Sequence, residues 1–275
     1  MCRIIVLLGI ILSVSNALYS QSHSEWIEIS FKYLNDNHLD SAEVALTNAL
    51  RAEPDNPLNA FLFHNLGTIQ RRLGKNKDAL QSYSLALRRY PKNKTFLSDR
   101  ASLNAETDDY VTALIDYNTL LEEEPNNEEA LYQRGLVNIE LKNFESAESD
   151  FNRMLELSPM SFYARLGLAT LYKVEKRYDE AEGIYIYLET KEPNHPEIYA
   201  GRAEIYLLKE KAGRALTEIN KAIRWSETEN PYFYIIRSRA KLLMREKDSA
   251  AEDIRKAMSL GYDAKEAEIL LRLTK

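Results

Sequence analysis

Residues 60–93 read AFLFHNLGTIQRRLGKNKDALQSYSLALRRYPKN. In the first half, residues three or four positions apart define one helical face: Phe63, Leu66, Gly67 and Gln70. The second half repeats that spacing at Ala79, Tyr83 and Ala86. The break at residues 73–75 predicts a turn, and Pro91 predicts the end of the second helix. The stretch therefore predicts a helical hairpin.

The place of Ala79 in this hairpin recurs along the chain. Successive alanines lie 37, 34, 34, 34, 34 and 35 residues apart: Ala42, Ala79, Ala113, Ala147, Ala181, Ala215 and Ala250. Five prolines follow their alanine at a constant distance of 12 residues: Pro54, Pro91, Pro125, Pro159 and Pro193. A fixed period of this length predicts a stack of helical hairpins, with no segment that has the alternation of a strand.

The hairpin resembles the tetratricopeptide repeat, whose pattern is W-x2-L-G-x2-Y, then A-x3-F, then P. Trp26 and Tyr33 supply the aromatic residues of that pattern in the first hairpin. The resemblance implies an all-α, right-handed superhelical solenoid of about seven such hairpins over residues 23–262. The expected repeats are 23–56, 60–93, 94–127, 128–161, 162–195, 196–229 and 231–262. Residues 263–275 are expected to form a C-terminal capping helix.

The first residues have the features of a secretory signal peptide: a basic start, a short apolar run and small residues at the exit. We expect residues 1–17 to be removed, with cleavage after Ala17 or as late as Ser20 or Gln21. The alternative is an uncleaved anchor. Export would place the protein in the periplasm or outside the cell. Cys2 would leave with the signal, so the mature chain would have no disulfide or thiolate metal site.

Charge and motifs narrow the function classes. Removing Arg3 leaves 35 basic and 42 acidic residues, a net charge near −7 that opposes binding to nucleic acid or anionic lipid. The sequence has none of the phosphate-loop, dinucleotide, zinc-protease or serine-hydrolase signatures. Its four histidines occupy unrelated repeat positions, which favours loop or surface residues over a metal site. We expect no enzyme activity, no cofactor and no metal.

One covariation recurs within the chain. With each alanine numbered as repeat position 20, position 7 is arginine in the same four repeats in which position 23 is acidic. The pairs are Arg100 with Asp116, Arg134 with Asp150, Arg202 with Glu218, and Arg237 with Asp253. The remaining repeats have neither charge, as in Leu168 with Ile184. Because one charge alone would be poorly solvated between two helices, the pattern predicts interhelical ion pairs.

The tetratricopeptide resemblance implies that the first helices line a concave groove through repeat positions 2, 5, 9, 12 and 13. Much of this face is apolar or aromatic, which favours a binding surface. The alternative is that these side chains pack between successive first helices. The candidate partner-binding residues are Phe31, Phe61, Arg71, Tyr132, Leu136, Tyr163, Leu166, Lys173 and Tyr232. No repeat has the lysine and asparagine with which some family members clamp a terminal carboxylate.

The sequence thus predicts an exported scaffold that binds a protein or peptide segment in this groove and supports assembly of a complex. One alternative is a self-assembling or membrane-associated structural scaffold. Another is a nucleic-acid binder of the pentatricopeptide kind, which the net acidity opposes. We expect no nucleic-acid partner, and no membrane contact once the signal is removed.

Overall fold

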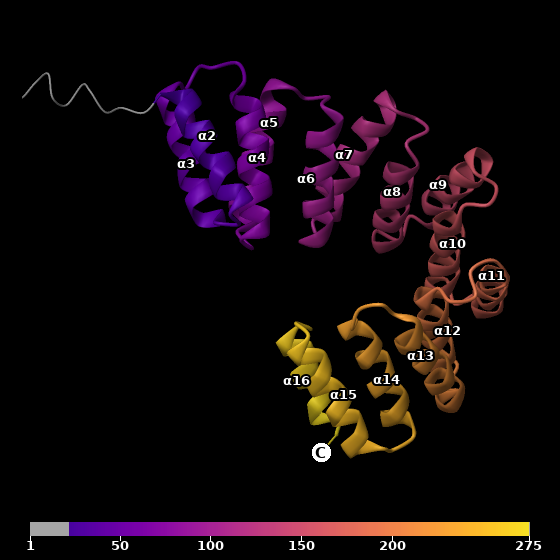
Figure 1. The fold of residues 1–275 in the computed structure, drawn as a ribbon. Helices are drawn as coiled ribbons and strands as arrows, with labels where there is room; N and C mark the ends of the chain where they lie inside the picture. Colours follow the sequence, from indigo (N-terminus) through magenta and orange to yellow (C-terminus); the bar gives the residue numbers. More distant parts are fainter. Residues whose placement is uncertain (1–21, 275) are drawn as a thin grey trace, which may run out of the picture. The chain divides into compact units, whose positions relative to one another are not determined.

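The computed structural model describes residues 22–274, and within that range it contains helices and no strand. The signal-peptide prediction for residues 1–17, with its alternative cleavage points, lies outside the described residues. The helices run as consecutive antiparallel pairs (Figure 1). Their bounds are α2 (His23–Asn35), α3 (Leu39–Ala52), α4 (Asn59–Arg72), α5 (Asn76–Arg89), α6 (Lys94–Glu106), α7 (Tyr110–Glu123), α8 (Glu128–Glu140), α9 (Phe144–Leu157), α10 (Phe162–Val174), α11 (Tyr178–Lys191), α12 (Pro196–Leu208), α13 (Ala212–Trp225), α14 (Pro231–Leu243), α15 (Lys247–Ser259) and α16 (Ala264–Arg272). The predicted all-α solenoid of helical hairpins is confirmed.

Each hairpin turns at the same repeat position. Position 15 has a positive φ, between 54° and 72°, in all seven hairpins: Asn37, Gly74, Asp108, Lys142, Lys176, Glu210 and Arg245. This left-handed conformation ends the first helix and lets the chain reverse. Only the second hairpin has the glycine that adopts it without steric cost. The turn is therefore set by the pairing of the two helices more than by its own sequence.

The chain divides into two compact units, and each is described here by itself. The N-terminal unit ends at Pro125 and contains α2–α7. The C-terminal unit begins at Asn126 and contains α8–α16. Within this second unit α16 packs on α15.

Large aromatic side chains fill the space that small residues leave inside the hairpins. The ring of Phe151 lies against Gly135 of its own hairpin and Gly167 of the next. A Cβ atom at these two glycines would lie 2.6 and 2.4 Å from Phe151 carbon atoms, closer than any real contact. The seven period-setting alanines are likewise fully enclosed. Small residues thus recur where the helices approach closely.

All four predicted interhelical ion pairs form. Arg100 donates from Nε and Nη2 to the two carboxylate oxygens of Asp116 at 2.8 and 2.7 Å. Arg237 donates to Asp253 through the same two nitrogen atoms. Arg134 pairs with Asp150, and Arg202 with Glu218. The carboxylates are buried, so the pairs belong to the packing of each hairpin.

Candidate partner-binding faces

Exposure of the first helices depends on repeat position. Positions 2 and 13 are exposed in every repeat, whereas positions 5 and 12 are mostly packed between helices. Position 2 presents Ser24, Phe61, Thr95, Glu129, Tyr163, Glu197 and Tyr232. The groove assignment is wrong for Ile139, Ala200 and Ile235, which are buried because neighbouring helices cover them. We call the residues at positions 2, 5, 9, 12 and 13 that are exposed or half-buried the first-helix face.

In the N-terminal unit the candidate residues divide into exposed and engaged side chains. Phe31 is 50% exposed and Phe61 44% exposed, and the Phe61 ring centroid lies 5.5 Å from those of Tyr90 and Phe96. Arg71 instead donates to the Ser102 hydroxyl at 3.0 Å and forms an ion pair with Glu106. The positive charge of Arg71 is thus already compensated within the chain.

In the C-terminal unit two tyrosines of the first-helix face meet edge to face. The ring centroids of Tyr132 and Tyr163 are 5.7 Å apart, and Tyr132 also lies 6.1 Å from Phe151. Tyr163 is 56% exposed, whereas Tyr132 is half-buried. Burial, with the nearby Glu197 carboxylate as the second cause, raises the pKa of Tyr132 to about 12. The two tyrosines thus form an aromatic surface in which one ring is half-buried and the other is accessible to a partner.

A cavity of about 370 Å³ opens beside these tyrosines. Its lining combines the two rings with Met154 and with the carboxylates of Glu128 and Glu129. A concave, largely apolar cavity with a few polar groups is the usual form of a binding site. Leu136 and Leu166 are half-buried, and Leu166 packs against the core around Tyr185, so these two candidates contribute to packing as well as to the face.

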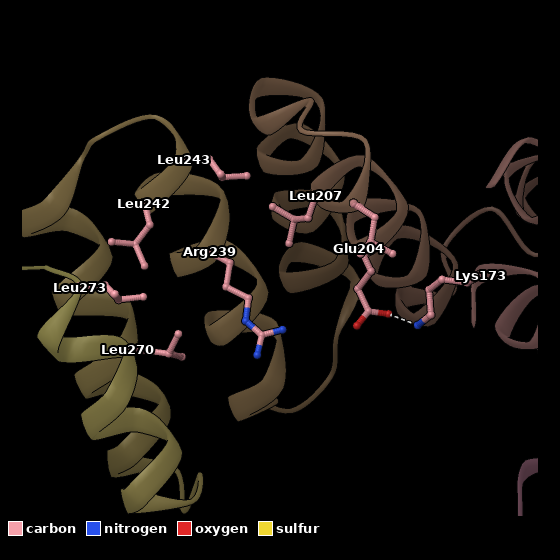
Figure 2. Close-up of a pocket in the computed structure, with 9 residues that line it drawn as sticks. Lys173, Glu204, Leu207, Arg239, Leu242, Leu243, Leu270 and Leu273 are labelled. Carbon is pink, nitrogen blue, oxygen red and sulfur yellow. Dashed lines mark hydrogen bonds and ion pairs between the residues drawn. The ribbon is translucent and has the colours of Figure 1, made fainter. Parts of the chain in front are cut away.

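A second, larger pocket of about 470 Å³ lies among α10, α12, α14 and α16 (Figure 2). We call it the leucine pocket, after the residues Leu207, Leu208, Leu242, Leu243, Leu270 and Leu273 that line it. Lys173 and Arg239 also reach it, and Lys173 donates to Glu204 at 2.6 Å. Glu204 accepts a further hydrogen bond from the hydroxyl of Tyr232, whose pKa burial and this carboxylate raise. Two candidate residues, Lys173 and Tyr232, therefore meet at one carboxylate.

The leucines of α16 were not among the sequence candidates. Residues 263–275 were expected only to form a capping helix, yet Leu270 and Leu273 line an open pocket and Leu273 is 58% exposed. Exposed apolar residues on a terminal helix were the available signal. The structure places them in the same pocket as Arg239 (Figure 2).

Two histidines lie close to polar side chains of neighbouring first helices. His23 is buried and its Nε2 lies 3.1 Å from the side-chain oxygen of Asn59, and the Nε2 of His64 lies 2.6 Å from a carboxylate oxygen of Asp99. The interpretation of the histidines as loop or surface residues is wrong for His23, which is buried because Asn59 at the start of α4 is its polar partner, whereas His64 is half-buried. Among residues 22–274, no cluster of three or more metal-ligating side chains gathers.

The acidic stretch at residues 122–129 includes the N-terminal cap and the first turn of α8. Asn127 caps α8 by accepting from the backbone nitrogen of Ala130 at 3.0 Å, and Glu128 and Glu129 lie in the first turn. The stretch is therefore a capped turn between repeats. No helix in the described part of the chain is both long and apolar enough to span a membrane.

Comparisons with known proteins find family models and solved structures that are similar to this chain. Family models of the tetratricopeptide repeat match residues 64–128 and 138–205. A tetratricopeptide repeat protein from Parabacteroides merdae is 46% identical, with 92% of this chain and 99% of that one covered and a TM-score of 0.87. Yeast Tom70 is 21% identical over 86% of this chain and 52% of its own, with a TM-score of 0.66. The type IV pilus biogenesis factor PilW is 17% identical over 77% and 98%, with a TM-score of 0.58. No curated protein matches in a sequence search.

Proposed function

We propose that this chain, which belongs to the tetratricopeptide repeat family, is an exported scaffold whose first-helix face binds a protein or peptide segment and supports assembly of a complex. Members of the family generally act in protein interaction. The four arginines at repeat position 7 are used in ion pairs of the fold. The proposal therefore rests on the exposed residues of the first helices.

The observation that carries this proposal is the exposed Tyr163 beside Tyr132. An aromatic ring that is held by a second ring and leaves over half its surface in solvent offers contact area at little entropic cost. The adjoining cavity of about 370 Å³ gives a partner side chain a place to insert. Aromatic anchors beside such cavities typically dominate the binding energy of an interface.

Replacing Tyr163 by alanine should weaken partner binding by roughly thirtyfold, because an aromatic anchor contributes about 2 kcal/mol or more. The measurement uses peptides selected from a random library on immobilised mature protein, with affinities determined for wild type and variant. The melting temperature should hardly change, since the Tyr163 ring is largely exposed.

Trp225→Ala is the matched control, since Trp225 is 43% exposed on α13, a second helix. Its affinity should equal that of wild type. Equal losses for both variants, or none for Tyr163→Ala, would place the binding surface elsewhere.

The export part of the proposal is supported by residues 1–17, with their basic start, apolar run and small exit residues. Sequencing the N-terminus of protein purified from its own cells should show Leu18 as the first residue, or a start just after Ser20 or Gln21. Recovery of intact Met1 would contradict removal of the signal.

A further inference from the structure

One positively charged side chain of the leucine pocket has no negatively charged partner in the pocket. Lys173 is paired with Glu204, which also accepts from Tyr232, and Figure 2 draws that ion pair as its dashed line. Arg239 extends between the leucines of α16 and Leu207 of α12 (Figure 2). No described residue offers it a hydrogen bond or a salt bridge. Arg239, an exposed residue, thus lies beside apolar side chains with no ion pair or hydrogen bond to the described part of the chain.

The other arginines on the first helices differ from Arg239 because their side chains form hydrogen bonds within the chain. Eight arginines lie on these helices, and seven of them donate a hydrogen bond to the chain: Arg71, Arg72, Arg100, Arg134, Arg165, Arg202 and Arg237. Arg237 binds Asp253 from the same helix that carries Arg239. Arg239 is the exception within the described range, so the fold does not use its charge.

The pocket's charge also differs from that of the chain. The whole sequence has a net charge of −6, whereas the charged groups of the pocket, Lys173, Glu204 and Arg239, sum to a single positive charge. A guanidinium binds a carboxylate through two parallel hydrogen bonds, and surrounding apolar groups strengthen that pair by excluding water. The complementary ligand is apolar with one carboxylate.

We propose that the leucine pocket binds an amphipathic helical segment of a partner protein, which packs apolar side chains on the leucines and places a glutamate or aspartate carboxylate on Arg239. The inference rests on the proposed function and names the chemistry of the partner. The leucines come from three helices, and a groove between helices accepts residues spaced three or four apart on a fourth. The volume of about 470 Å³ is within the range of ligand sites, roughly 300 to 1,000 Å³.

The probe is a synthetic amphipathic helical peptide with leucines at positions i, i+4 and i+7 and one glutamate beside them. Acetylated and amidated ends remove the terminal charges, so the glutamate is the only carboxylate on the apolar face. Companion peptides carry glutamine or lysine in its place. Mature wild-type protein should bind the glutamate peptide about tenfold more tightly than the glutamine peptide, because a charge-assisted hydrogen-bonded pair is lost.

Substitutions at Arg239 make the test specific. Arg239→Gln should remove the preference for the glutamate peptide, and Arg239→Glu should reverse it in favour of the lysine peptide. A misfolded protein cannot produce such a reversal. Arg224→Gln, at an exposed arginine of α13, makes the same change in net charge and should leave the wild-type preference intact.

Several results would overturn the inference. They are failure of the glutamate peptide to bind wild type, equal affinity for the glutamate and glutamine peptides, and an unchanged preference in Arg239→Gln. A concentration-dependent dimer that Arg239→Gln dissociates would identify a second copy of the chain as the occupant instead. If library-selected peptides still bind through Tyr163 when the probe does not, this inference fails alone; if neither binds, the proposed function fails with it.

Discussion

Replacing Gly167 by valine is expected to lower the free energy of unfolding by about 3 kcal/mol. A Cβ atom at this position would lie 2.4 Å from Cε1 of Phe151, and the Phe151 ring is fully enclosed and has nowhere to move. The overpacking outweighs the few tenths of a kcal/mol that valine gains over glycine in helix propensity. Urea unfolding followed by circular dichroism measures the difference.

Gly183→Val is the matched control for this prediction. Gly183 also lies inside a helix, α11, but a Cβ atom there would meet no atom within 4 Å. Its stability should stay within roughly 0.5 kcal/mol of wild type. Shortening the enclosed ring in Gly167→Val/Phe151→Leu should restore part of the loss. Equal losses at the two glycines would show that helix propensity, and not the contact with Phe151, determines the effect.

Replacing Arg100 by leucine should destabilise the protein by about 3 kcal/mol, because it leaves the Asp116 carboxylate without its partner. The Asp116 side chain is only 2% exposed, so water cannot take the place of the guanidinium. The double variant Arg100→Leu/Asp116→Ile should recover most of the loss. Leu168 and Ile184 already form such an apolar pair at the same repeat positions.

A double-mutant cycle on these two positions measures how much the ion pair contributes to stability. The account predicts a coupling free energy of about 2 kcal/mol or more between Arg100 and Asp116. Additive losses from the two single variants would mean that the ion pair seen between the helices does not contribute to stability.

The repeat period made the fold predictable from sequence. The alanines, the turn positions and the charged pairs each recur in register, so an error at one repeat is corrected by the others. The pairing of Arg134 with Asp150 could be inferred because the two residue types appear and disappear together. Internal repetition thus supplied the comparison that a single sequence normally lacks.

Features that occur once were harder to infer. Gly167 and Gly201 lie at repeat position 6, where most repeats have other residues, and only the structure shows Phe151 and Tyr185 against them. The burial of His23 depends on Asn59 at the start of α4. Lys173 was a candidate for partner binding, but its pairing with Glu204 depends on a side-chain direction that spacing does not determine. The same holds for the lack of an ion pair between Arg239 and the described residues.

The central claim, that the first-helix face binds a partner, is tested most directly by site-specific photo-crosslinking. A photoreactive phenylalanine analogue is placed at Tyr163 on α10 or at Trp225 on α13, both exposed aromatic positions of the C-terminal unit. In cells that express the protein from its own gene, the account predicts a discrete partner adduct from position 163 and none from position 225. An adduct from position 225 alone would contradict it.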